Sequence, residues 1–378
     1  MNTIAISSKP HYQILDGLRG VASVMVVAFH IFEAHATSSQ NQIINHGYLA
    51  VDFFFLLSGF VIGYSYDDRW SKMSIGSFFK RRLVRLQPMI VVGMVIGAVC
   101  FYFQDSTLWP TIHQVPVWKM LLIMLIGFTL IPVPPSMDIR GWQEMHSLNG
   151  PAWSLFFEYI ANILYAIGFR KLPNTALSIL VFIAGCALIH LAVTSHGGDL
   201  IGGWSITPEQ LRIGFTRMMY PFFAGLLLSR IAKLTYVNYA FFGCSLLLII
   251  ILSIPRIGST DHVWMNGLYD SLSVIILFPL IIFLGASGDI KGKRASRICK
   301  FLGDISYPIY ITHYPLIYIY TAWVSDHKPT IQHALPFALL TFASSFLLAY
   351  ACLKWYDEPV RRWLKKKLAK SNKVDVHS

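Results

Sequence analysis

The stretch that decides the fold is ILDGLRGVASVMVVAFHIFEAHA, residues 14–36. It is apolar and long enough to cross a bilayer, yet it carries Asp16, Arg19, His30 and Glu33. Ionisable groups are costly inside a membrane, so those that persist there are candidates for function. Arg19 and His30 are eleven residues apart, which is about 16 Å and close to three turns of a helix, so their side chains share one face. The segment predicts a helix with a permanent cation toward one leaflet and a titratable base toward the other.

Each of these residues also has a simpler explanation when it is taken alone. Arg19 can snorkel to the lipid headgroups, and His30 can be a hydrogen-bonded interior histidine. A cleaved signal peptide is a further alternative, with Lys9 and Arg19 as its basic start, residues 21–29 as its apolar core and an Ala-His-Ala triplet as its cleavage site. His30 is an unusual residue so close to a signal-peptide cleavage site, so we expect the segment to be retained in the mature protein.

The composition indicates a membrane protein built from many helices. The chain has 378 residues, of which 55% are hydrophobic and only 13% are charged, about half the charged share of a soluble domain. Its formal net charge is +12, but the basic residues gather in short loops beside apolar segments, so the positive-inside rule explains them better than nucleic-acid binding does. The five cysteines are scattered singly, which predicts neither a disulfide framework nor a metal site.

Apolar segments recur along the whole chain and predict an all-α bundle of transmembrane helices. We expect one transmembrane unit over residues 14–355, between a cytoplasmic leader at 1–13 and a basic cytoplasmic tail at 356–378. The expected number is about ten crossings plus one re-entrant or interfacial piece at 119–133, the shortest run and one that ends in prolines. The eleven segments are 14–36, 48–66, 86–103, 119–133, 152–169, 176–195, 213–231, 238–254, 270–286, 302–322 and 335–355.

The orientation follows from the basic clusters. The densest one, which we interpret as a loop after the second segment, holds Arg81, Arg82 and Arg85 and is placed in the cytoplasm. Both termini are then cytoplasmic, Arg19 lies toward the inner leaflet and His30 toward the outer one. The tail resembles an interfacial helix whose simplest role is to bind anionic lipid.

Further polar residues lie inside the apolar segments. Asp52 is expected at the depth of His30, where a carboxylate could orient the imidazole. Ser58 and Gly59 follow about two turns deeper, where a helix-packing role is as good an explanation as a functional one. The segment NGPAWSLFFEY contributes Trp153, Ser154 and Glu158, and LGDISYPIYITHYP contributes Tyr307, Tyr310 and His313. Together these groups suit a buried reaction chamber with a cytoplasmic mouth that binds an anion.

With these motifs the sequence resembles the acyltransferase 3 family of integral-membrane O-acyltransferases, over roughly residues 12–361. The resemblance is carried by DGLRG with the following FH, VDFFFLLSGF, KRRLVRLQP, PAWSLFFEY, GDISYPIYITH and the closing EPVR, in that order. Each motif is weak alone, and six in the right order with this hydropathy are specific.

The resemblance implies transfer of an acyl group, usually acetyl from acetyl-CoA as a co-substrate, to a hydroxyl of a cell-surface or lipid-linked carbohydrate at the bacterial inner membrane. It implies no permanently bound cofactor and no metal. His30 is then the general base, oriented by Asp52 or Glu158, and Ser58, Tyr310 or His313 stabilises the oxyanion. The expected donor-binding residues are Arg19, Arg81, Arg82 and Arg85, and the expected supporting residues are Ser58, Trp153, Ser154, Tyr307 and Tyr310.

The main alternative is a proton-coupled transporter of a sugar or glycan, in which the same groups form a proton relay. The sequence leaves open the acceptor sugar, acetyl against a longer acyl group, direct transfer against an acyl-enzyme, the acceptor's leaflet and the oligomeric state.

Overall fold

The structure is a computed structural model that describes residues 9, 11–290 and 292–374, with side chains up to 368. Most of the expected leader at 1–13 and the end of the expected tail lie outside the described residues. The described part is helical, as predicted, apart from one isolated β-bridge between Val237 and Gly288. The α-helices are α1 (Gln13–Glu33), α2 (Ala50–Tyr66), α3 (Ile75–Cys100), α4 (Val117–Gly127), α5 (Ala152–Ile167), α6 (Asn174–Thr194), α7 (Pro208–Ile231), α8 (Ala240–Ser253), α9 (Trp264–Leu272), α10 (Phe278–Ala286), α11 (Lys293–Thr312), α12 (Tyr314–His327), α13 (Ile331–Ala351) and α14 (Glu358–Val374).

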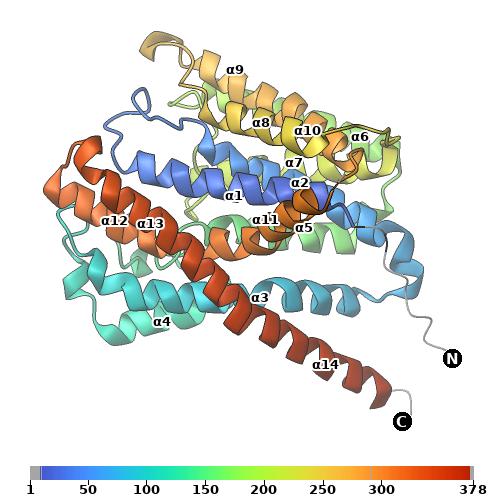
Figure 1. Ribbon diagram of the computed structural model, residues 1–378, viewed down its shortest axis with the longest axis horizontal. Coiled ribbons are helices and arrows are strands. Elements are labelled where there is room, and N and C mark those ends of the chain that lie inside the picture. Colours follow the sequence, from blue (N-terminus) through green and yellow to red (C-terminus); the bar gives the residue numbers. More distant parts are fainter. Residues whose placement is uncertain (1–8, 10, 291, 375–378) are drawn as a thin grey trace.

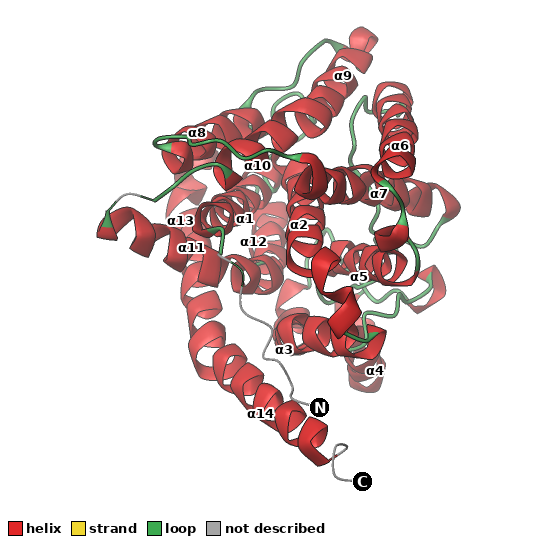
Figure 2. Ribbon diagram, turned by 90° about the vertical axis from the view of Figure 1, so that its right-hand side faces the viewer, coloured by secondary structure: helices red, strands yellow, loops and turns green. Residues whose placement is uncertain are grey.

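The helices are bundled around α1 and α2. Most of them run along the long axis of the molecule, and α14 leaves the bundle obliquely at the end where α1 begins (Figure 1). In the view turned by 90°, α1 and α2 lie inside a ring of other helices, with α8 and α10 above them and α3 below (Figure 2). The segment predicted to be the first crossing is therefore central to the molecule.

Six helical segments are long and apolar enough, by length and composition, to cross a membrane. They are Gln13–Glu33, Gly47–Lys72, Ile75–Gln104, Asn174–Thr194, Trp264–Ala286 and Ile331–Leu368. The number of about ten crossings stays a prediction. Helix α4 has 11 residues, or about 16 Å, half of the roughly 30 Å that a crossing needs. That length agrees with the non-crossing piece expected at 119–133.

Two predicted boundaries are corrected. The basic run expected as a cytoplasmic loop is helical, because α3 begins at Ile75, where Ser74 caps it by accepting a hydrogen bond from the backbone of Ser77. The apolar segment expected at 302–322 is divided between α11 and α12, which meet at His313. Proline follows that break, since Pro315 stands in the first turn of α12.

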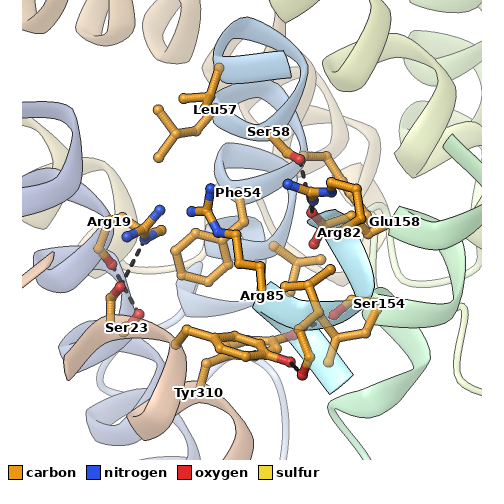
Figure 3. A pocket seen from close by; sticks show the side chains of 17 residues that line it. Arg19, Ser23, Phe54, Leu57, Ser58, Arg82, Arg85, Ser154, Glu158 and Tyr310 are labelled. Carbon is orange, nitrogen blue, oxygen red and sulfur yellow. Dashed lines mark hydrogen bonds and ion pairs between the residues drawn. The ribbon is translucent and has the colours of Figure 1, made fainter. Parts of the chain in front are cut away.

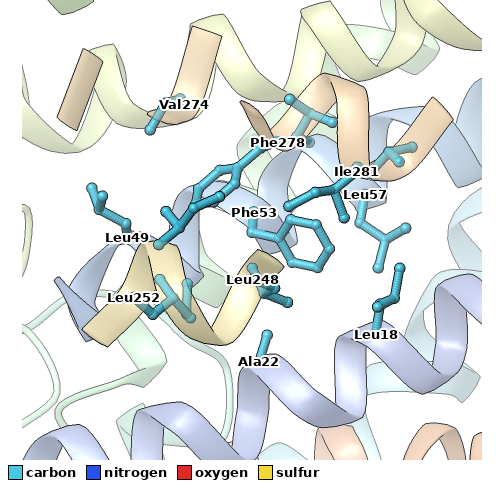
Figure 4. Packing of buried hydrophobic residues seen from close by; sticks show 14 of the residues in the cluster. Leu18, Ala22, Leu49, Phe53, Leu57, Leu248, Leu252, Val274, Phe278 and Ile281 are labelled. Carbon is cyan, nitrogen blue, oxygen red and sulfur yellow. The ribbon is translucent and has the colours of Figure 1, made fainter. Parts of the chain in front are cut away.

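Interdigitated apolar side chains hold α1 and α2 against α8 and α10. Phe53 of α2 is fully buried among them, and its ring meets that of Phe278 edge to face, with the centroids 5.5 Å apart (Figure 4). Glycines permit closer contacts elsewhere: a Cβ on Gly20 would lie 2.4 Å from the Leu302 carbonyl oxygen, and one on Gly59 would lie 1.9 Å from the Phe222 carbonyl oxygen. The bundle core therefore fixes α1 against α11 and α2 against α7.

The segment between α4 and α5 is folded into the protein. Arg140, Glu144 and His146 are all at least 95% buried. The backbone N–H of Met145 donates to the Trp204 carbonyl over 2.7 Å, and the Asn149 side chain donates to the Ile311 carbonyl over 2.7 Å. This segment consequently forms one wall of the site described next.

Candidate active site

Three adjoining cavities follow one another through the bundle. We name them the basic cavity, of about 1020 Å³, the central cavity, of about 100 Å³, and the aromatic cavity, of about 700 Å³. Arg19, Arg85 and Tyr307 line both the basic and the central cavity. Val51 and Tyr310 line both the central and the aromatic cavity. The central cavity is thus the narrow link between two larger spaces.

Helix α1 contributes a polar side chain to each end of this route. Arg19 stands between the basic and central cavities, where its Nε donates to the Ser306 hydroxyl over 2.8 Å and its Nη2 lies 3.0 Å from Asp16 Oδ1. His30 lines the aromatic cavity. The predicted arrangement of a guanidinium and an imidazole along one helix therefore faces adjoining cavities rather than lipid.

His30 is oriented by its own helix. Its Nδ1 lies 2.7 Å from Glu33 Oε2, three residues on. When Nδ1 donates to this carboxylate, Nε2 carries the lone pair and can accept a proton. The ring is also held by Tyr314, whose ring meets it edge to face at 4.7 Å, and by His313, which stacks on it at 5.6 Å.

The expectation that Asp52 or Glu158 orients His30 is corrected by their contacts. Asp52 is fully buried and pairs with Arg217 of α7, over 2.6 Å from Oδ2 to Nη2 and 3.2 Å from Oδ1 to Nε. Depth along a helix could not reveal this partner, because Arg217 approaches from the side, across the close contact of α2 with α7. Arg217 also donates to the Tyr48 and Gly202 carbonyls, so the pair is saturated with hydrogen bonds.

Glu158 lies in the central cavity and binds α3 instead of His30. Its Oε1 accepts from Arg82 Nη2 over 2.5 Å and from the Ser58 hydroxyl over 2.9 Å (Figure 3). This pair keeps Arg82 inside the protein, where it is 5% exposed. Ser58 therefore has a polar partner, while its neighbour Gly59 provides the close helix contact.

The expected arginine cluster divides between two cavities. Arg82 and Arg85 line the central cavity, and Arg81 and Arg85 line the basic one. Arg81 and Arg85 are solvent-exposed, and neither has an ion-pair partner in the part of the chain that the structure describes. Figure 3 shows the Arg85 guanidinium between Arg19 and Arg82, directed into the central cavity.

Tyr310 is the expected hydroxyl best placed at the link between the cavities. It lies 2.7 Å from the Ser154 hydroxyl, and either oxygen can donate. Tyr307 by contrast donates to the Leu86 carbonyl over 2.8 Å. Trp153 lines the aromatic cavity and packs 5.3 Å from the Arg217 guanidinium.

The role expected for His313 as an oxyanion donor is corrected. His313 is fully buried, and it is not among the residues that line the three cavities. Its Nδ1 lies 3.0 Å from the carbonyl oxygens of Ile309 and Tyr310, so this donor is occupied by the backbone of α11. Its ring supports that of His30 instead.

Several site residues were missed from the sequence, because they come from the loops and helix ends that fold over the aromatic cavity. Glu144 accepts a hydrogen bond from the Tyr318 hydroxyl over 2.6 Å, and burial raises the pKa of this carboxyl to about 7. Arg140 supports it at 3.6 Å and stacks on the Tyr318 ring at 3.5 Å. No local signal marks Glu144, since only the tertiary fold brings its loop to α12. The remaining aromatic wall includes Phe29, Tyr48, Trp109, Trp142, Trp204 and Tyr314.

Comparisons with known proteins identify the family of this chain. The family described as acyltransferase domain matches residues 12–354. The O-acetyltransferase OatA of Staphylococcus aureus is 22% identical over 371 residues, which cover 92% of this chain and 57% of that protein. The peptidoglycan O-acetyltransferase OatA of Listeria monocytogenes is 23% identical over 94% of this chain and 56% of its own length.

The chain thus spans little more than half the length of these two relatives. Protein 2 in picA locus of Rhizobium radiobacter is 32% identical over 167 residues, 42% of this chain and 83% of that protein. No solved structure matches. The family match begins at residue 12, just before the central helix α1, and ends in the π-helical turn before α14. It covers the lining of the central and aromatic cavities and most of the lining of the basic cavity, and the chain belongs to the acyltransferase domain family.

Proposed function

We propose that this chain is a membrane O-acetyltransferase that moves an acyl group from acyl-CoA to a carbohydrate hydroxyl. The observation that carries the proposal is the route from Arg19 to His30 through the central cavity. The two relatives that match over most of the chain are named O-acetyltransferases, which supports the reaction. The central cavity, at about 100 Å³, favours a short acyl group such as acetyl.

The donor would enter from the basic cavity, which faces the cytoplasm in the predicted orientation. CoA is a polyanion, and arginine forks suit its phosphates. Arg19 and Arg85 stand where the basic cavity narrows into the central one. The pantetheine arm would pass between them and carry the thioester toward Tyr310.

The acceptor would occupy the aromatic cavity, on the side of the membrane opposite the donor. A pocket with an aromatic wall and few polar groups suits a sugar ring, whose apolar face packs on indole and phenol rings while its hydroxyls find specific partners. Glu33, Glu144 and His30 supply those partners. The carbohydrate class is a surface or lipid-linked glycan.

The chemistry follows from the free nitrogen of His30. Nε2 takes the proton of the acceptor hydroxyl while the oxygen attacks the thioester carbon, and Glu33 stabilises the resulting imidazolium. The oxyanion is stabilised by the hydroxyl of Tyr310 or of Ser154. As the new C–O ester bond remains and the C–S bond breaks, the CoA thiolate takes the proton back from His30, so the enzyme is restored.

The test uses the purified full-length chain with acetyl-CoA and glycans extracted from the host cell surface. His30→Ala should lower the release of CoA thiol by roughly 10²–10⁴-fold, the usual cost of removing a positioned base. His190→Ala, which changes an exposed histidine of α6 outside the three cavities, is the matched control. Ordinary turnover in His30→Ala would refute the catalytic role. Release of no thiol by the wild-type chain with any extract would favour the transporter.

A further inference from the structure

The basic cavity has a second wall that the motifs do not account for. Helix α14 contributes Arg361, Arg362, Lys365 and Leu368 to its lining. Lys365 follows Arg361 by four residues and Arg362 by three, and Leu368 follows Lys365 by three, so these side chains share one side of the helix. Helix α3 contributes Lys80, Arg81 and Arg85 to the lining of the same cavity. The two walls come from segments almost 300 residues apart in the sequence.

The charges on the two walls are unequally neutralised. Three lining cations pair with carboxylates three or four residues away in the chain: Arg19 with Asp16, Lys300 with Asp304, and Arg361 with Asp357. Among the described residues no carboxylate pairs with the five others, Lys80, Arg81, Arg85, Arg362 and Lys365. Five unpaired cations around one cavity create a strongly positive field that a polyanion would relieve.

The length of the last helix explains why its cations can reach this place. The continuous segment Ile331–Leu368 has 38 residues, or about 57 Å, nearly twice the hydrocarbon thickness. It must therefore leave the membrane, and Figure 1 shows α14 projecting past the end of α3. A π-helical turn at Cys352–Asp357 separates it from α13. Such a turn changes the direction of the face that follows it.

The order of the cavities assigns a part of the donor to each wall. Arg85 lines the link to the central cavity, whereas the residues of α14 line the basic cavity alone. CoA carries its pyrophosphate in the middle and its 3′-phosphate at the nucleoside end, farthest from the thioester. With the thioester in the central cavity, the pyrophosphate meets Arg85 at the link, and the 3′-phosphate is left to cations that line the basic cavity alone, among them Arg362 and Lys365.

We propose that α14 is part of the donor site and that Arg362 and Lys365 bind the 3′-phosphate of CoA. This inference rests on the proposed function, because it needs acyl-CoA to be the donor. It differs from the simpler view of the tail as a lipid anchor. Lys366 and Lys367 lie on the same helix and are exposed, but they do not line the cavity, so they remain available to lipid headgroups.

The experiment measures binding of CoA and of 3′-dephospho-CoA to the full-length chain in nanodiscs of phosphatidylcholine. The wild-type chain should prefer CoA about tenfold. The double variant Arg362→Ala/Lys365→Ala should lose about tenfold in CoA affinity and bind both ligands alike, as two partly exposed charge contacts predict. The control Lys366→Ala/Lys367→Ala removes the same charge from positions that do not line the cavity and should keep the preference.

Two contrary outcomes are distinguishable. If the wild type binds CoA but the double variant retains its preference over 3′-dephospho-CoA, the assignment of α14 is wrong and the proposed donor stands. An equal loss of CoA affinity in both double variants would also overturn the assignment of α14, because only the total charge of the helix would then matter. If the wild type binds neither ligand, the proposed function fails together with the inference.

Discussion

The aromatic and basic cavities differ in how their charges are treated. In the aromatic cavity each charged lining residue has a partner: His30 has Glu33, Arg217 has Asp52, and Glu144 has Tyr318. In the basic cavity five cations lack one among the described residues. One space is arranged to recognise a ligand by shape and by hydrogen bonds with fixed directions, and the other to attract a ligand by charge. This difference suits the two substrates of the proposed function, an uncharged sugar and the polyanionic CoA donor.

Among the substitutions that test this difference between the cavities, the largest loss of activity is expected at Glu33. Glu33→Gln keeps a side chain able to accept from His30 Nδ1 but removes the charge that stabilises the imidazolium. We expect kcat to fall roughly 10²-fold, with the KM for acetyl-CoA unchanged. Initial rates of thiol release measure both, and Glu209→Gln, at an exposed position on α7, is the control. A wild-type kcat in Glu33→Gln would contradict the assigned pair.

A smaller effect is expected in the basic cavity. Arg81→Ala should raise the KM for acetyl-CoA about threefold to tenfold and leave kcat nearly unchanged, because an exposed cation contributes to capture rather than to chemistry. The KM of the wild type should also rise with ionic strength, since exposed charges are screened. Arg294→Ala removes a cation of α11 outside the cavity and serves as the control. A KM that is insensitive to both salt and Arg81→Ala would erase the contrast between the cavities.

The smallest effect concerns the stability of the aromatic cavity wall. Burial raises the pKa of Glu144 to about 7, above its value in the unfolded chain, so the folded protein binds the extra proton more tightly. Stability is therefore greatest below the unfolded pKa and decreases as the pH rises toward 7. Glu144→Gln should flatten this dependence by a few degrees in melting temperature. Thermal unfolding of both proteins between about pH 5 and 7 checks it, and parallel curves would refute the shift.

The sequence was most informative where function and helix periodicity coincide. The spacing of Arg19 and His30 predicted a shared helix face, and the structure places both on cavities of one adjoining series. It was less informative about α3, where dense cations were interpreted as a loop. A helix can carry Arg81 and Arg85 at this depth because they project into an open cavity instead of lipid.

Lateral contacts were beyond the reach of the sequence. Position along a helix indicates depth, but Asp52 and Glu158 face Arg217 and Arg82, neighbours that only the packing of whole helices determines. The same holds for Glu144, whose loop reaches α12 only after the bundle has formed. His313 was expected in the cavity because it shares a motif with Tyr307 and Tyr310, yet backbone carbonyls of α11 occupy its donor.

The small size of the central cavity has a consequence for the cell. Two wide vestibules that met freely would form a pore, and any ion that crossed it would dissipate the electrochemical gradient of the membrane. At about 100 Å³, the link admits the end of a pantetheine arm but leaves little room for a continuous water column. A bound donor would plug it, so group transfer across the membrane need not make the membrane leak.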